Sequence, residues 1–152
     1  MPKSSVKIGS SIMMAMAVFA LVISLLWVSI TEVKFVSDFL AYTGQDLSDA
    51  LAAGSKSAEL WLVTKRLWGV ELLAISLLTM FITAKSYARG EKRSWYALLV
   101  TGCILWGSLM GYKFAIGYFQ LTMSSMTFIV GAILFAIGIA LPAKAILGKK
   151  ST

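Results

Sequence analysis

The segment IGSSIMMAMAVFALVISLLWVSI, residues Ile8–Ile30, contains 23 residues and no charged side chain. A helix rises about 1.5 Å per residue, so a run of this length can cross a hydrocarbon layer about 30 Å thick. Three further apolar runs follow, at Leu60–Thr83, Trp95–Phe119 and Met126–Leu141. The sequence therefore predicts an all-α fold, a four-span transmembrane helical bundle that forms a single integral membrane domain over residues 1–152.

The composition of the whole chain agrees with this interpretation. Of its 152 residues, 59% are hydrophobic and only 14% are charged, which suits a membrane bundle better than a soluble domain. The net charge of +7 does not indicate nucleic-acid binding, because the basic residues are scattered among the ends of the spans instead of forming one face. We expect the lipid bilayer to surround the protein and expect no nucleic-acid partner.

The charges between the spans predict the orientation. The N-terminal segment, the second connection and the C-terminal segment sum to +8, from Lys3, Lys7, Lys85, Arg89, Glu91, Lys92, Arg93, Lys144, Lys149 and Lys150. The first connection, residues 31–59, sums to −3, and the third, around Gln120–Ser125, is uncharged. Because basic residues are retained on the cytoplasmic side, we expect an N-in, C-in topology, with the plasma membrane as the first choice of membrane.

The first connection is expected to be a short, partly helical outer loop. It contains several residues of the types that begin and end helices. These are Ser37 for a helix from Asp38 to Gly44, Asp46 or Ser48 for a helix that ends at Gly54, and Ser55 or Ser57 for the second span. At the other end of the chain, Pro142 is expected to end or kink the last span.

Several kinds of chemistry are excluded by residue types. The chain has no histidine, and Cys103 is its only cysteine. His-based metal or haem sites, His-dependent acid–base catalysis and an intrachain disulfide are therefore ruled out. No nucleophile or metal-ligand set accompanies the few ionisable groups in the spans. We expect no catalytic residues, no cofactor and no metal site, and a protein that is not an enzyme.

Two charged residues inside the spans require an explanation. A charge near the bilayer centre costs about 2.5–3.5 kcal/mol, so Glu71 and Lys113 each need a partner. Both are expected about 9–11 Å inward from the outer ends of adjacent spans, which predicts an intramembrane ion pair. The pair would either fix the register of two helices or serve as a proton or cation site. Possible neighbours of such a site are Thr64, Lys65, Arg66 and Tyr112.

Small residues indicate how the helices pack. Small side chains at one helical face let another helix approach closely. The candidates are Gly107 and Gly111 in a GxxxG relation, Gly131 and Gly138 seven residues apart, and Ser10, Ala17 and Ser24 at the same spacing. The glycine face and the Lys113 face of the third span differ, so one of them meets a second protein, or a four-helix square satisfies both.

Two functional hypotheses follow. The first is a non-catalytic integral membrane subunit with an assembly or accessory role, which packs within a larger membrane complex or with copies of itself. The second is a small oligomeric transporter or channel that uses an intramembrane Glu71/Lys113 site. The first is preferred because the small-residue faces favour helix packing and no cofactor ligands are found.

Overall fold

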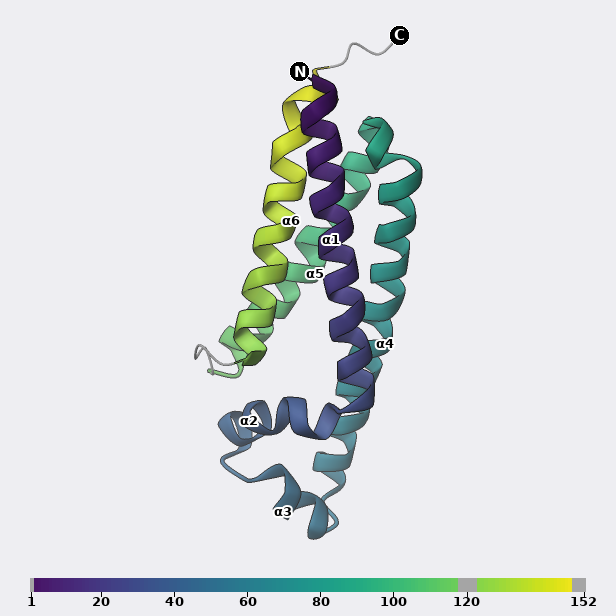
Figure 1. Ribbon diagram of the computed structural model, residues 1–152. Coiled ribbons are helices and arrows are strands. Elements are labelled where there is room, and N and C mark those ends of the chain that lie inside the picture. Colours follow the sequence, from purple (N-terminus) through teal and green to yellow (C-terminus); the bar gives the residue numbers. More distant parts are fainter. Residues whose placement is uncertain (1, 118–122, 149–152) are drawn as a thin grey trace.

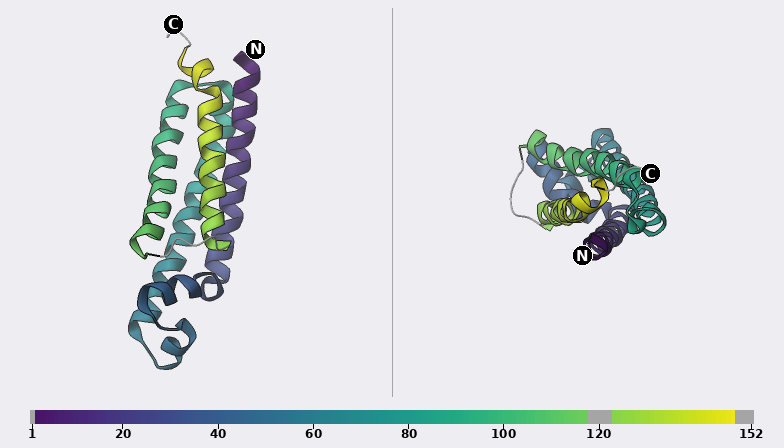
Figure 2. Two further views of the ribbon diagram at one scale, coloured as in Figure 1. Left: turned by 90° about the vertical axis from the view of Figure 1, so that its left-hand side faces the viewer. Right: turned by 90° about the horizontal axis from the view of Figure 1, so that it is seen from above.

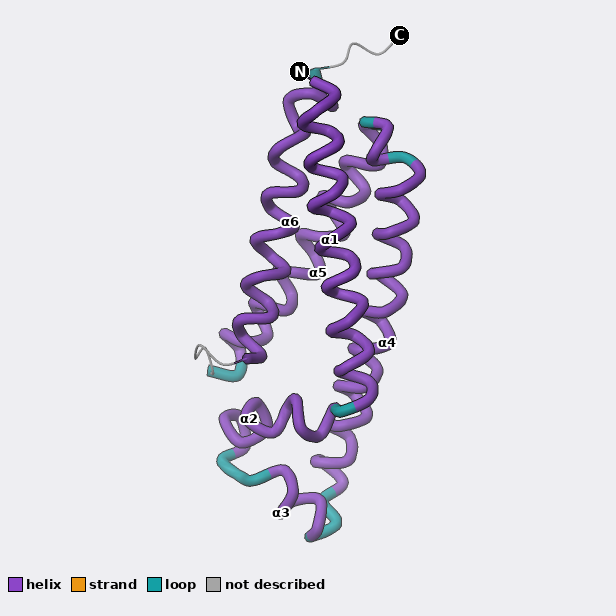
Figure 3. Tube along the Cα trace, viewed as in Figure 1, coloured by secondary structure: helices purple, strands orange, loops and turns teal. Residues whose placement is uncertain are grey.

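The computed structural model describes residues 2–117 and 123–148, and these residues form helices and no β-strand. The helices are α1 (Pro2–Ser29), α2 (Thr31–Thr43), α3 (Leu47–Ala52), α4 (Lys56–Lys85), the 3₁₀ helix η1 (Tyr87–Arg89), α5 (Lys92–Ala115) and α6 (Met123–Leu147). The connections between them within the described residues are short (Figure 3). The prediction of an all-α fold is confirmed.

Four of the helices are long and apolar enough to cross a membrane, as predicted. These candidate spans are Ser4–Ser29, Lys56–Arg89, Lys92–Ala115 and Ser125–Leu147. They run side by side along one axis, and α2 and α3 lie at one end of the bundle (Figures 1 and 2). The N-terminus, the turn between α4 and α5, and the end of α6 lie at the opposite end (Figure 1).

Helix α1 is the centre of the packing, because it lies against both α4 and α6 over most of its length. The small residues predicted to form its packing face, Ser10, Ala17 and Ser24, are all buried. On α6, a Cβ atom at Gly138 would come within 2.7 Å of the Met13 sulfur, so a larger residue there would force the Met13 side chain to move. Gly138 therefore occupies a helix contact of the predicted kind.

The contact between α5 and α6 also depends on glycine. A Cβ atom at Gly131 would lie 1.9 Å from the Trp106 ring, and one at Gly102 would lie 2.0 Å from the Phe135 ring. A Cβ atom at Gly107 or at Gly111 would meet no described atom within 4 Å, and both glycines are exposed. The glycine of α5 that contacts α6 is thus Gly102, and the predicted GxxxG pair lies on the outer surface of the helix.

Helix α6 does not end at Pro142 but continues to Leu147. Proline has no N–H, so it cannot donate to the carbonyl of Gly138 four residues earlier. The hydroxyl of buried Tyr87 donates to the Gly138 oxygen at 2.6 Å, and the indole N–H of Trp95 donates to the Ile139 oxygen at 3.0 Å. Two aromatic side chains from the η1 and α5 region therefore satisfy carbonyls near Pro142.

The segment between α1 and α4 is more helical than predicted. Helix α2 begins at Thr31 and not at Asp38, and only Ile30 separates it from the end of α1. Its end at Gly44, which has φ +72°, is confirmed. Helix α3 ends at Ala52, two residues before the predicted end at Gly54. Asp46 caps α3 by accepting from the N–H groups of Ser48 and Asp49, and Ser55 caps α4, as predicted. The earlier start of α2 places Asp38 inside a helix, two turns from its first residue.

Candidate functional site

A buried ion pair joins α2 to α5. The Lys113 Nζ atom lies 2.6 Å from Asp38 Oδ1, and both side chains are 0% exposed. The Tyr112 hydroxyl donates to the other carboxylate oxygen, Oδ2, at 3.2 Å. Both oxygens of Asp38 therefore have a donor from the last turn and a half of α5, as a buried carboxylate requires.

Lys113 is thus paired with Asp38 and not with Glu71, which corrects the predicted intramembrane pair. Helix α5 ends at Ala115, and Gly117 follows with φ +66°. Lys113 therefore lies in the last turn of the helix, nearer to the helix end than was predicted. Phe119, where the span was expected to end, lies outside the described residues. Glu71 lies halfway along the 30-residue α4 and is exposed. The two residues therefore differ in height along the bundle.

Lys65 is the second cation buried at this end of the bundle. It is 2% exposed, and its Nζ atom lies 3.6 Å from the ring centre of Trp68, 3.8 Å from that of Tyr112 and 4.3 Å from that of Trp61. Desolvated cation–π contacts of this kind contribute up to about 2 kcal/mol each. Within the described residues, however, the ammonium group has no hydrogen-bond acceptor and no ion pair.

Positive charge exceeds negative charge around Asp38. Half-buried Lys34 also lies close enough to interact electrostatically with both Asp38 and Lys113. Burial lowers the pKa of Lys34, the Lys113 charge lowers it further, and Asp38 opposes the shift. Lys65 interacts with the same two charges. Three ammonium groups, those of Lys34, Lys65 and Lys113, therefore surround the Asp38 carboxylate.

An open groove of about 570 Å³ borders the Lys65 ammonium. The three rings that surround Nζ also line this groove, together with Phe39 and Tyr42 of α2. Tyr42 stacks on Trp61 with ring centres 6.2 Å apart, and the Trp61 Nε1 atom is buried with no hydrogen-bond acceptor among the described residues. We call this feature, with Lys65 at its wall, the aromatic groove.

Only some of the residues that were predicted to surround a charged site lie near the buried ion pair. Lys65 and Tyr112 lie beside Asp38 and Lys113, as described above. Thr64 lines the aromatic groove, but its hydroxyl donates to the Leu60 carbonyl at 2.8 Å. Arg66 pairs with exposed Glu32 of α2 at 3.4 Å and does not join the cluster.

Asp38 was placed by the sequence at the start of a helix in the outer loop and was not predicted as the partner of Lys113. No local pattern distinguishes it from the other acids of that segment. The aromatic surroundings of Lys65 left a clearer signal, since Trp61 and Trp68 lie four residues before and three after it. This spacing places all three side chains on one helical face.

A second open feature lies between α4 and α5. Helix α5 packs mainly against α6 and touches α4 only sparsely, which leaves a cleft of about 500 Å³. Glu71, Thr101 and Ser108 are the polar side chains on its walls, and within the described residues Glu71 has no ion pair or hydrogen bond. At 100° per residue, Gly111 lies about 20° from Ile104, another residue of this wall. Gly111 therefore lies on the side of α5 that carries Ile104, whereas Gly107 lies about 60° from Ile104, and neither glycine lines the cleft.

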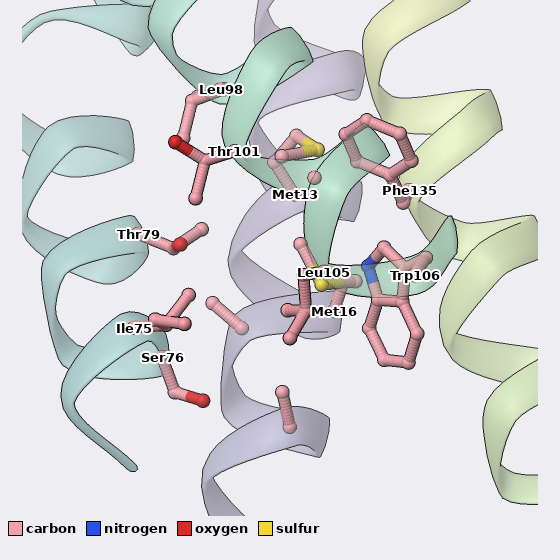
Figure 4. Close-up of a pocket in the computed structure, with 13 residues that line it drawn as sticks. Met13, Met16, Ile75, Ser76, Thr79, Leu98, Thr101, Leu105, Trp106 and Phe135 are labelled. Atoms are coloured by element: carbon pink, nitrogen blue, oxygen red, sulfur yellow. The ribbon is translucent and has the colours of Figure 1, made fainter. Parts of the chain in front are cut away.

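The centre of the bundle offers no comparable site. Met13, Thr79, Leu98, Trp106 and Phe135 are among the residues around a cavity of about 10 Å³ (Figure 4). This is roughly the space that one water molecule needs. No charged side chain lines the cavity, and the described residues contain no cluster of three His, Cys, Asp or Glu side chains that could hold a metal ion.

Comparison of the chain with protein-family models, with curated proteins and with solved structures gave no match. Three features of the structure are therefore the candidates for a functional role: the aromatic groove, the buried ion pair and the α4–α5 cleft.

Proposed function

We propose that the protein is a non-catalytic integral membrane subunit that assembles with another membrane protein through the α4–α5 cleft. The observation that carries this proposal is the position of Glu71. Its carboxylate is exposed on the wall of the cleft, halfway along a helix that is long and apolar enough to span a membrane. An unpaired charge at that depth would cost about 2.5–3.5 kcal/mol.

A helix seated in the cleft would remove this cost if it offers Glu71 a cation or a hydrogen-bond donor. Gly107 and Gly111 are exposed on the outer surface of α5 and would let the backbone of a helix that also reaches the cleft approach α5 closely. The proposed role thus uses the one predicted small-residue pair that has no contact within the described chain.

The partner is proposed to be a different subunit. In a two-fold dimer through this face, the same surface meets itself, so each Glu71 would need a donor from the same face of the other copy. Between Arg66 and Lys85 helix α4 has no basic residue, and between Arg93 and Lys113 helix α5 has none. A second copy therefore brings the hydroxyl groups of Thr101 and Ser108 but no cation to the middle of the cleft, so a different subunit is preferred as the source of a cation.

The orientation proposed is N-in and C-in, in the plasma membrane, with α2 and α3 outside. Support comes from the basic residues Lys7, Lys85, Arg89, Arg93 and Lys144, which belong to segments that meet at one end of the bundle (Figure 1). Positive charge of this kind is retained in the cytoplasm.

A transporter or channel that uses Glu71 and Lys113 as one site has less support. Asp38 holds Lys113 in a fully buried pair, and the cavity at the bundle centre has room for about one water molecule. Neither feature provides a path between the two residues.

Native mass spectrometry of the protein, extracted with its partners in mild detergent, tests the assembly role. We expect a hetero-complex for the wild type, and its loss in Gly111→Leu, because the added side chain fills the approach surface. Ala136→Leu, a similar enlargement on the exposed face of α6, is the control and should preserve the complex. A homo-oligomer would overturn the choice of partner, and a monomer under every mild extraction condition would overturn the proposal.

A further inference from the structure

The aromatic groove contains the donors of two side chains, Lys65 and Trp61, for which the described residues provide no acceptor. The Lys65 ammonium group carries three N–H donors and the Trp61 indole carries one. Trp61 Nε1 is buried without a hydrogen-bond acceptor within the described residues. Lys65 makes no ion pair there, and its Nζ atom contacts aromatic rings. Cation–π contacts balance part of the lysine charge, but they provide no oxygen for its N–H groups. The groove therefore lacks a hydrogen-bond acceptor.

The same corner of the molecule also lacks negative charge. Lys34, Lys65 and Lys113 are balanced by the single carboxylate of Asp38, whose two oxygens are already occupied by Lys113 and Tyr112. The other carboxylate of α2, Glu32, is exposed and pairs with Arg66. An acceptor that reaches Lys65 is expected to be an anion, because a water molecule would leave the excess positive charge in place.

The groove also has apolar surface that suits the body of an amphiphile. Its other lining residues include Phe39, Leu60, Ala115 and Ile116, and its volume of about 570 Å³ is typical of a pocket for a small organic ligand. Trp61 and Tyr42 stack at its rim, and such rings are enriched at the level of lipid headgroups.

We propose that the aromatic groove binds an anionic amphiphile, with its carboxylate or phosphate on Lys65 Nζ and Trp61 Nε1 and its apolar chain along the groove. The same chemistry is offered by a free fatty acid and by the headgroup of an anionic phospholipid. This site is separate from the α4–α5 cleft, so it does not depend on the proposed assembly role.

Quenching of tryptophan fluorescence tests this proposal directly, because Trp61 and Trp68 line the groove. The probes are a brominated fatty acid and its uncharged methyl ester, added to the purified full chain in detergent. We expect the acid to quench saturably and to bind at least about tenfold more tightly than the ester. Equal quenching by acid and ester in the wild type would overturn the proposal without any variant.

Variants identify the binding group. Lys65→Met keeps the length of the side chain but removes its charge, so it should weaken binding of the brominated acid about tenfold or more and leave the ester unchanged. Lys65→Arg should retain most of the affinity. The matched control is Lys56→Met, which changes an exposed lysine of the same helix that pairs with Glu59. If Lys65→Met does not fold, Trp61→Phe should weaken acid binding alone. Unchanged acid binding in a folded Lys65→Met protein would overturn the assignment.

The source of the anion is distinguished by a second pair of probes. Brominated phosphatidylglycerol and brominated phosphatidylcholine, in vesicles with the reconstituted protein, differ in net charge. A lipid headgroup is indicated if phosphatidylglycerol quenches more than phosphatidylcholine and also more than the fatty acid. The reverse order indicates a free fatty acid. Absence of preference in both pairs of probes would overturn the proposal.

Discussion

Asp38 is the carboxylate that faces the ammonium groups of Lys34, Lys65 and Lys113 at the α2 end of the bundle. A buried charge pair contributes little net stability, but removing one partner leaves the other uncompensated at a cost of about 3–5 kcal/mol. The consequence for these residues is asymmetric. Loss of Lys113 leaves Asp38 with two nearby cations, whereas loss of Asp38 leaves three cations with no carboxylate among them.

We therefore expect Asp38→Asn to lower the free energy of unfolding more than Lys113→Met does, each by about 3–5 kcal/mol. The double variant should lose less than the sum of the two. Unfolding by a denaturing detergent, followed by circular dichroism, measures all three. The exposed pair Lys56 and Glu59 provides the control, where each change should cost under about 1 kcal/mol. Additive losses in the Asp38 and Lys113 cycle would contradict the coupling.

Local sequence identified some of these residues and not others. The caps Asp46 and Ser55 were predictable because a cap acts on backbone groups two or three residues away. The partner of Lys113 was not, because Asp38 lies 75 residues earlier and meets it only through the placement of α2. Lys65 falls between these cases, since two of its rings are on its own helix and Tyr112 comes from α5.

Among the helices, α6 shows how a proline is accommodated without a break. Pro142 removes one intrahelical donor, and the Tyr87 hydroxyl replaces it on the buried Gly138 oxygen. The hydrogen bond connects the turn after α4 to α6, so it holds two elements that are distant in sequence. It is therefore a structural link as well as a substitute donor.

Tyr87→Phe should lower the free energy of unfolding by about 1–3 kcal/mol, because it leaves the Gly138 carbonyl without a donor. Pro142→Ala restores the intrahelical N–H, so it should recover part of this loss in the Tyr87→Phe background. Chemical unfolding in detergent measures both variants, and Tyr96→Phe, at an exposed tyrosine of α5, is the control. Equal stability of Tyr87→Phe and Tyr96→Phe would refute the role of this hydroxyl.

The length and hydropathy of the four spans were predictable from composition, but the rotation of each helix was not. The GxxxG pair at Gly107 and Gly111 is visible in the sequence, yet the contact with α6 is made by Gly102, on another face of α5. A small-residue pattern shows where a helix can approach closely. Which face meets a neighbour within the chain depends on all the helices together.

For the whole molecule, the orientation in the membrane determines which end meets which solution. In a Cys103→Ser background, we expect Gln45→Cys to react with a membrane-impermeant maleimide on intact cells. Ser4→Cys, at the opposite end of the bundle, should react only after the cells are opened. Both positions are exposed, so accessibility to solvent is matched. Reaction of Ser4→Cys on intact cells would contradict the N-in orientation.

The central position of α1 has a consequence for biosynthesis. Its two main neighbours are α4 and α6, so the first of the four long helices packs against the last. The part of α1 that meets α6, which includes Gly9 and Met13, remains uncovered by α6 until that helix has been synthesised. The tertiary bundle is therefore completed only after translation of α6, and a chain arrested before that point would present the α1 face to the insertion machinery and to membrane proteases.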